Sequence, residues 1–164
     1  MAEPAPRYVL LSGGAGYIGS HTLIEMLESS PEYAPVVVDN LYNASRESIT
    51  RIEALTGKKV PFYDIDLTKD PATSGLDDLF TKYSFHSVIN FAGMKAVGES
   101  MKIPLEYYSC NLSIVFNLLA VMKKHGVKNF VFSSTACVYG EPQYLPIDES
   151  HPCGYIIPVC CFFH

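Results

Sequence analysis

The sequence predicts an α/β fold built on a doubly wound parallel sheet of about five strands. Two observations carry this prediction: apolar runs of strand length alternate with amphipathic segments, and a glycine-rich turn joins the first run to the first helix. Hydrophobic residues make up 48% of the 164 residues, enough to bury the core of one domain.

The first predicted strand, Arg7–Ser12, runs directly into the glycine-rich turn. Gly14, Gly16 and Gly19 match the pattern G-x-G-x-x-G, while Gly13, Gly16 and Gly19 match the related G-x-x-G-x-x-G. The first glycine makes the tight turn, Gly16 lets the backbone approach a pyrophosphate, and Gly19 allows the helix to pack closely on the sheet. The unpaired N–H groups of the following helix would face the phosphates.

The helix after this turn has an apolar stripe, for which we expect burial of Ile18, Leu23, Met26 and Leu27. The second strand, Val36–Val38, ends in Asp39, where a carboxylate accepts hydrogen bonds from an adenosine ribose and repels a 2′-phosphate. The order of strand, glycines, helix, strand and acid therefore predicts a dinucleotide site that favours NAD over NADP. The alternative is an ordinary glycine-rich turn and a surface Asp.

The rest of the chain continues the alternation. We expect further strands at Val60–Ile65, Ser87–Ala92 and Lys128–Ser133. We expect helices within 41–57, where Ile49, Ile52 and Leu55 are apolar, within Gly75–Tyr83, with Leu76, Leu79 and Phe80 on one side, and at Pro104–Lys124, stopped by Gly126. This order is typical of a Rossmann sheet, whose ligands lie beyond the carboxyl ends of the strands.

Composition argues against several classes of partner. There are 17 acidic and 12 basic side chains without a basic cluster, so we expect no nucleic-acid partner. No apolar stretch suggests a membrane span, and the N-terminus lacks the pattern of a signal peptide, so we expect a cytoplasmic protein. Five cysteines without a C-x-x-C pair argue against disulfides and a metal site.

Five stretches resemble the UDP-glucose (UDP-galactose) 4-epimerase family of extended short-chain dehydrogenases/reductases. They are Gly13–His21, Asp39–Leu41, Phe91–Ser100, Pro104–Tyr108 and Ser133–Gly140. The likeness runs from about Tyr8 to Pro152 and covers only the N-terminal half of the family pattern, and the segment 95–100 resembles epimerases in particular.

The resemblance implies roles for individual positions. The pyrophosphate would be lined by Gly13, Gly16, Tyr17 and Ile18, beside Gly19 of the fingerprint; the adenosine ribose by Asp39, Asn40, Asn43 and Ala44; and the adenine by Asp66 and Leu67. The nicotinamide half would be held by Phe91, Ala92, Gly93 and Lys95, with Asn111 facing the cofactor. Lys95, Ser133 and Thr135 would face the substrate, with Thr135 bonding its hydroxyl as the catalytic Ser/Thr of the family. A Thr that only satisfies backbone at a strand end is the alternative for Thr135.

The implied chemistry is redox-neutral isomerisation. NAD would take a hydride from C4 of a UDP-hexose while a base removes the 4-hydroxyl proton, and the 4-keto sugar would turn over and take the hydride back. The whole protein would interconvert UDP-galactose and UDP-glucose in galactose metabolism. The resemblance also implies a homodimer.

The chain departs from the family near its end. The family's base is the Tyr of a Tyr-x-x-x-Lys motif, and no Tyr here is followed by Lys at that spacing. We therefore expect an incomplete NAD-binding domain at 1–152, an aberrant apolar tail at 153–164, no substrate domain, and a chain that binds NAD weakly and does not epimerise. Two alternatives are a catalytically dead NAD-binding or interaction fragment and, with Ala136 and Cys137 counting against it, a nucleotide-sugar 4,6-dehydratase.

Overall fold

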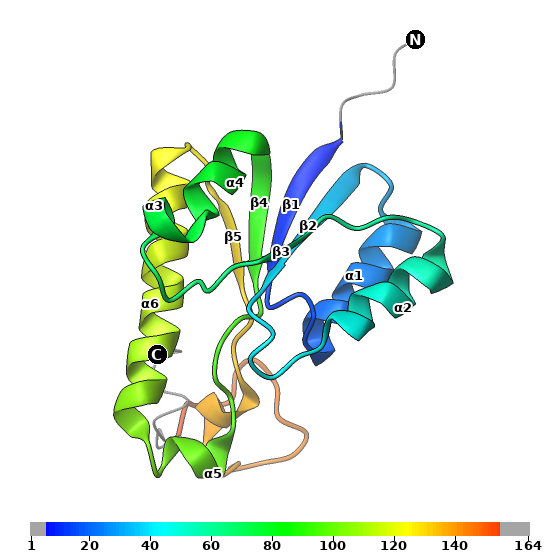
Figure 1. Ribbon diagram of the computed structural model, residues 1–164. Coiled ribbons are helices and arrows are strands. Elements are labelled where there is room, and N and C mark those ends of the chain that lie inside the picture. The colour runs from blue at the N-terminus through cyan, green and yellow to red at the C-terminus, as the bar shows by residue number, and fades with distance from the viewer. Residues whose placement is uncertain (1–5, 155–164) are drawn as a thin grey trace. The chain divides into compact units, whose positions relative to one another are not determined.

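The computed structural model describes residues 6–154 and contains one parallel sheet of five strands. The strands are β1 (Arg7–Ser12), β2 (Tyr33–Asp39), β3 (Phe62–Asp64), β4 (Phe85–Asn90) and β5 (Asn129–Phe132). Their order in the sheet is β3-β2-β1-β4-β5 (Figure 1). The chain thus moves outward from β1 to β3 and then returns to build the other side from β4, which confirms the doubly wound fold.

Six α-helices and one 3-10 helix lie in the described residues. They are α1 (Tyr17–Ser29), α2 (Arg46–Thr56), α3 (Pro71–Ser74), α4 (Leu76–Lys82), α5 (Val97–Ser100), α6 (Pro104–Lys124) and the 3-10 helix η1 (Ala136–Tyr139). The bounds of β1 and α6 match the prediction, and Gly126 has the positive φ of 72° expected of a helix stop. The short elements α3, α5 and η1 were not predicted, since each spans about one turn and shows no apolar period.

Other strand bounds differ from the prediction by a few residues. The third strand is only Phe62–Asp64, because just these three residues pair with β2. Val60 and Ile65 at its flanks are nevertheless buried, which explains why the apolar run is longer than the strand. The fourth strand begins earlier, at Phe85, and the fifth is shorter at both ends.

The structure divides into two compact units, described here separately. The first unit comprises residues up to 92 together with 113–132, and therefore holds the whole sheet. Helices α1 and α2 cover one face of this sheet, while α4 and α6 cover the other (Figure 1). Val36, Val37 and Val38 are fully buried, as a strand between two helical layers requires.

Ile18, which we expected in the buried stripe of the first helix, lies in solvent instead, and Leu55 of the second helix is also exposed. Ile18 is 56% exposed in the first turn of α1, and Leu55 is 76% exposed near the end of α2. The buried stripe of α1 is carried by Leu23 and Leu27. Ile49 and Ile52 carry that of α2. The expected burial was therefore wrong for Ile18, in the first turn of α1.

Helix α6 is the one helix in the described part of the chain that is long and apolar enough to cross a membrane. The prediction that no such stretch exists was therefore wrong by length and composition. Its residues Leu118, Val121 and Met122 are buried in the first unit. A helix that packs in a protein core meets the same criterion.

The second unit comprises residues 93–112 and those from 133 onward. Its small core is Tyr107, 1% exposed, with Met94, Ile103 and Cys137 packed on it. At its C-terminal side the Gly154 N–H donates to Val138 O at 3.1 Å. Most of the tail predicted as aberrant, residues 155–164, lies outside the described residues.

Candidate functional site

The glycine turn after β1 is built by close backbone contacts. Gly13 has a φ of 71°, and a Cβ there would lie 2.6 Å from Ala92 N. A Cβ at Gly19 would lie 2.4 Å from Gly13 O, so no larger residue fits without moving the turn. Gly19 thus allows the helix to approach the turn itself, rather than the sheet as we predicted. A Cβ at Gly16 would meet only one atom within 4 Å, Gly13 O at 3.3 Å, so the space around Gly16 is otherwise open.

The N-terminus of α1 has no cap from the protein. Gly16 is its N-cap residue and offers no side chain, and the first turn contains no acidic residue. By contrast, Ser45 caps α2 and Asp70 caps α3 through their side chains. The first N–H groups of a helix have no partner within the helix, and they carry the positive end of its dipole. An uncapped helix end beside an open glycine offers N–H groups to which a phosphate group can bind.

Asp39 ties this turn to the end of β2. Its carboxylate is 7% exposed and accepts hydrogen bonds from two backbone N–H groups, Ala15 N at 3.1 Å and Leu41 N at 2.9 Å. Each carboxylate oxygen retains a further lone pair for a ribose hydroxyl. The structure therefore gives Asp39 a structural role that sequence reasoning missed, alongside the predicted contact with the ribose.

The other predicted ribose positions follow β2. Asn40 and Asn43 are exposed in the loop, and Asn40 accepts a hydrogen bond from Tyr42 N at 3.1 Å. Ala44 is partly buried against the core beneath α1 and α2. The exposed Asn40 and Asn43 are therefore accessible to a ligand, whereas Ala44 anchors the loop to the core.

The predicted adenine positions lie in a loop that α6 holds in place. Asp66 accepts hydrogen bonds from Thr68, and Leu67 is buried at 4% exposure. Asn117 donates from its side-chain nitrogen to Leu67 O at 2.8 Å and to Lys69 O at 2.9 Å. Asn117 lies 50 residues away in the sequence, so no local pattern could have identified it.

A buried polar pair lies below the turn at the ends of β1 and β4. Ser12 and Asn90 are at most 1% exposed, and the Ser12 hydroxyl donates to Asn90 Oδ1 at 2.5 Å. Phe91 N donates to Ser12 O at 2.8 Å, which fixes Phe91 beside the glycine turn. The Asn90 side chain also reaches Ala92 O at 3.4 Å. The predicted positions Phe91 and Ala92 thus belong to the first unit with the glycine turn and Asp39.

The remaining predicted positions belong to the second unit. Gly93, Lys95 and Asn111 lie there, and Asn111 bonds the backbone of Met94 through both its side-chain oxygen and its nitrogen. The Lys95 side chain is exposed. The structure therefore places Asn111 against the loop that carries Lys95.

Ser133 and Thr135 also lie in the second unit and are half-buried. Thr135 is the N-cap of η1, where its hydroxyl oxygen accepts a hydrogen bond from Cys137 N at 3.3 Å. This is the backbone role that we named as the alternative for Thr135. Its hydroxyl hydrogen remains able to donate, so the cap does not prevent a contact with a sugar oxygen.

Several other side chains of these segments make ring or packing contacts. The His21 ring lies 4.9 Å from the Tyr17 ring, edge to face, and Tyr107 is the centre of the second unit's core. Cys110 and Cys137 are half-buried. Within residues 6–154, no group of three His, Cys, Asp or Glu side chains is arranged to hold a metal ion.

Comparison with known proteins identifies the family of this sequence. Residues 9–158 match the NAD dependent epimerase/dehydratase family. The chain is 56% identical to human UDP-glucose 4-epimerase over 152 residues, which are 89% of this chain and 42% of the human protein. It is 49% identical to the Bacillus subtilis UDP-glucose 4-epimerase over 150 residues, 92% of this chain and 43% of that one. The chain thus spans less than half the length of these relatives.

Solved structures agree with the sequence relatives. The UDP-glucose 4-epimerase of Bifidobacterium longum, determined with NAD+ and UDP, is similar with a TM-score of 0.85 and 45% identity, over 93% of this chain and 44% of that one. The Thermus thermophilus UDP-glucose 4-epimerase, in complex with NAD, has a TM-score of 0.77 and 31% identity, over 93% and 46% of the two chains. Both likenesses extend over nearly all of this chain.

Proposed function

The chain belongs to the NAD-dependent epimerase/dehydratase family, and from this premise we propose that it is the NAD-binding part of a UDP-hexose 4-epimerase. The whole protein would interconvert UDP-galactose and UDP-glucose. One observation carries the proposal most directly: the open Gly16, the uncapped α1 and the buried Asp39 belong to one unit and have the order that a dinucleotide requires.

The residues present fit NAD. A Cβ at Gly13 or Gly19 would collide with neighbouring backbone and displace the turn, whereas Gly16 leaves room for a pyrophosphate above the first turn of α1. NAD, when bound, supplies reversible hydride transfer at the sugar C4. The chain's own contribution would be to hold the phosphates at α1, orient the ribose through Asp39, and flank the adenine with Asp66 and Leu67.

Asp39 supports the choice of NAD over NADP. Its carboxylate is fixed by two backbone N–H groups and cannot turn away from a 2′-phosphate without losing them. Arg46, the nearest following cation in the sequence, stacks on the Phe62 ring at 4.6 Å instead of pairing with Asp39. The repulsion of a 2′-phosphate would therefore not be neutralised there.

At the substrate, Thr135 would hydrogen-bond the sugar hydroxyl, and Lys95 and Ser133 would contribute polar contacts. The family's proton-transferring Tyr and its Lys have no counterpart in the printed 164 residues. We propose that the printed chain alone binds NAD without turnover, and that the whole protein is the epimerase. A dehydratase is disfavoured, because Ala136 and Cys137 offer neither the acid nor the base that a 4,6-elimination needs.

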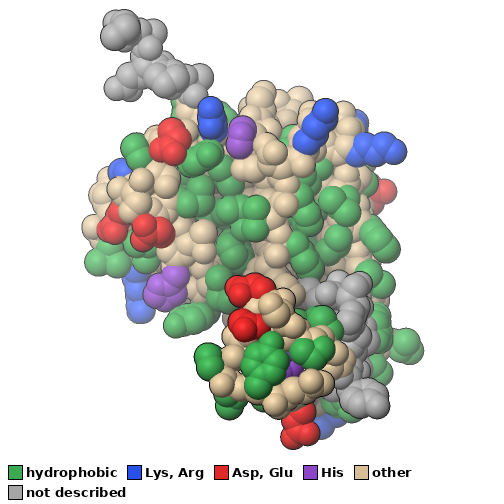
Figure 2. Space-filling model, turned by 180° about the vertical axis from the view of Figure 1, so that it is seen from behind, with side chains coloured by type: hydrophobic (Ala, Val, Ile, Leu, Met, Phe, Trp, Pro, Cys, Tyr) green, Lys and Arg blue, Asp and Glu red, His purple; other side chains and the backbone are tan. Residues whose placement is uncertain are grey.

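We further propose a cytoplasmic homodimer without nucleic-acid or membrane partners. The net charge of −5 and the scattering of Lys and Arg at the margins of the face in Figure 2 support the absence of nucleic acid. Phe116, 63% exposed on α6, and Leu119, 43% exposed, support an apolar subunit interface. Light scattering on the whole protein would measure its mass in solution.

Calorimetric titration of the printed chain with NAD and NADP tests the proposal. NAD should bind, NADP should bind at least about tenfold more weakly, and Gly16→Ala should weaken NAD at least about tenfold by placing a methyl group at the pyrophosphate. The control is Gly98→Ala, because a Cβ at Gly98 meets no atom within 4 Å. Equal affinity of both glycine variants, or no NAD binding, would contradict the proposal.

A UDP-galactose conversion assay with NAD present shows whether a chain that binds NAD also catalyses epimerisation. NAD binding without turnover by the printed chain agrees with the proposal. Turnover by the printed chain would show that it needs no Tyr-x-x-x-Lys motif.

A further inference from the structure

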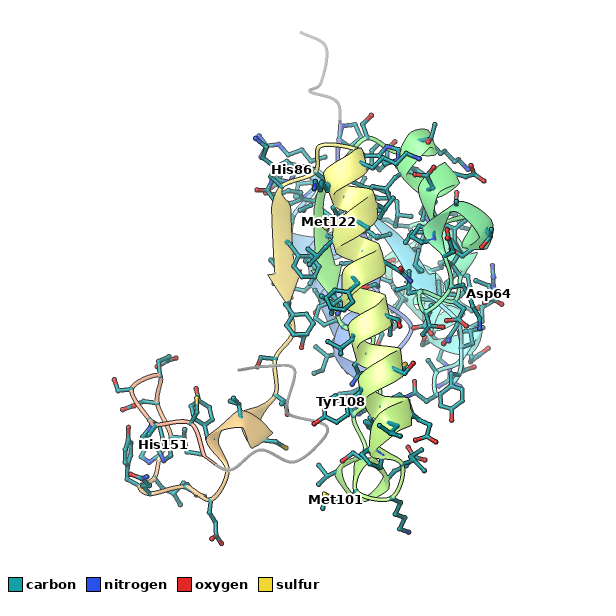
Figure 3. All side chains as sticks on the ribbon, turned by 90° about the vertical axis from the view of Figure 1, so that its left-hand side faces the viewer. Asp64, His86, Met101, Tyr108, Met122 and His151 are labelled. Atoms are coloured by element: carbon teal, nitrogen blue, oxygen red, sulfur yellow. The ribbon has the colours of Figure 1, made fainter. Side chains whose placement is uncertain are left out.

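The loop that carries Lys95 is held by two side chains of α6 that lie one helical turn apart. Tyr107 and Asn111 are four residues apart, so they occupy the same face of the helix. Both are buried, with exposures of 1% and 9%. Figure 3 shows this end of α6, with Tyr108 labelled on the helix and Met101 in the loop before it.

Asn111 pairs with the residue before Lys95. Met94 N–H donates to Asn111 Oδ1 at 2.7 Å, and Asn111 Nδ2 donates to Met94 O at 3.0 Å. Both backbone groups of Met94 are thus satisfied by one amide. The contact is close enough that a Cβ at Gly93 would lie 3.1 Å from Asn111 Oδ1.

Tyr107 pairs in the same way with the residue after Lys95. Its hydroxyl oxygen accepts a hydrogen bond from Ala96 N at 3.1 Å. Its single proton has two acceptors in reach, Ala96 O at 3.0 Å and Glu99 Oε2 at 2.8 Å. Since the ring is the centre of the second unit's core, the hydroxyl is fixed by packing.

From this arrangement we propose that Tyr107 and Asn111 form a clamp that fixes the backbone on both sides of Lys95 and thereby presents its side chain to the nicotinamide half of the dinucleotide. The inference rests on the proposed function. Tyr107 is a positioning residue, because its hydroxyl acts on Lys95 only through the peptide groups of Ala96. Because the backbone on both sides of Lys95 is already fixed, less backbone freedom is lost when the Lys95 side chain binds a ligand.

Amide hydrogen exchange of the full chain, measured by NMR without any ligand, tests the clamp itself. Tyr107→Phe keeps the packed ring and removes only the hydroxyl, so exchange at the Ala96 amide should accelerate about tenfold. Asn111→Leu removes both the acceptor for Met94 N–H and the donor to Met94 O, so exchange at the Met94 amide should accelerate as well. Tyr33→Phe, which removes a hydroxyl from β2, is the control. Unchanged exchange at Ala96 in Tyr107→Phe would overturn the clamp.

Titration with two ligands tests the positioning role. Tyr107→Phe should weaken NAD about five- to tenfold and leave ADP unchanged, because ADP has the adenosine and pyrophosphate but no nicotinamide. Equal effects on both ligands, or no effect on NAD, would overturn the positioning role. If the unaltered chain binds neither ligand, the proposed function fails, and hydrogen exchange still decides the clamp.

Discussion

Replacing Asp39 by Asn separates the two roles that the structure gives this carboxylate. The side chain keeps its shape, but only one of its two terminal atoms can then accept a hydrogen bond. Because Ala15 N and Leu41 N each donate to a different carboxylate oxygen, one of them would face an amide N–H₂ group instead.

The cost follows from these two hydrogen bonds. A hydrogen bond to a charged group contributes about 1.5–3 kcal/mol, and a buried N–H without an acceptor costs about 1–3 kcal/mol. Loss of one bond and weakening of the other should lower the free energy of unfolding by about 3 kcal/mol. That is a large fraction of the roughly 5–15 kcal/mol available to a domain of this kind.

Urea denaturation of the chain without ligand measures this change. Asp39→Asn should lower the urea midpoint by about 1–2 M. Asp64→Asn is the matched control, since Asp64 lies opposite Asp39 in the neighbouring strand and is exposed. If Asp39→Asn were as stable as Asp64→Asn and merely lost NAD, the carboxylate would serve the ribose alone and our reasoning about the turn would be refuted.

Three further predictions concern the turn, a charge cluster and the core. Gly19→Ala places a Cβ 2.4 Å from Gly13 O, so it should destabilise by about 1–3 kcal/mol and weaken NAD, measured by denaturation and titration; unchanged values would contradict the close approach. Hydrogen bonds from Lys124 and His125 hold the pKa of Asp77 below its ordinary 3.8, so its stabilising effect is present above that value and lost as pH falls through the lower folded pKa. The stability difference between the unaltered chain and Asp77→Asn should therefore narrow below about pH 4, and a constant difference in acid denaturation would argue against it. Leu118→Ala, at a fully buried position of α6, should cost about 2–5 kcal/mol in urea denaturation, whereas Leu55→Ala, on the exposed side of α2, should cost little.

The parts of the fold that could be predicted from sequence are those with a strong local pattern. The turn from β1 into α1 and the helix from Pro104 to Lys124 both have local markers, glycine spacing in one and a terminal Pro and Gly in the other. The edges of β3 could not be found, because Val60 and Ile65 are buried without pairing in the sheet. Burial and strand pairing produce the same apolar run in a sequence.

The site shows the same division. Asp39 could be predicted because its distance from Gly19 is fixed by one helix and one strand. Asn117 and Tyr107 could not, because each hydrogen-bonds the backbone of a residue outside its own helix, and the backbone N–H and C=O groups are the same in nearly every residue. An Asn or Tyr within an apolar helix has no sequence mark that separates packing from anchoring a loop.

Because the N-terminus of α1 has no cap, the stability of the folded chain would depend on the concentration of its dinucleotide. A protein that supplied its own cap at Gly16 would be more stable when empty, but it would compete with the phosphate for the same N–H groups. At α1 a bound phosphate would complete the helix instead. At a free NAD concentration a hundred times the dissociation constant, binding would add about 2.7 kcal/mol to the free energy of unfolding. The supply of dinucleotide in the surroundings would then act as a folding partner, and depletion of it would expose the chain to unfolding before any residue had changed.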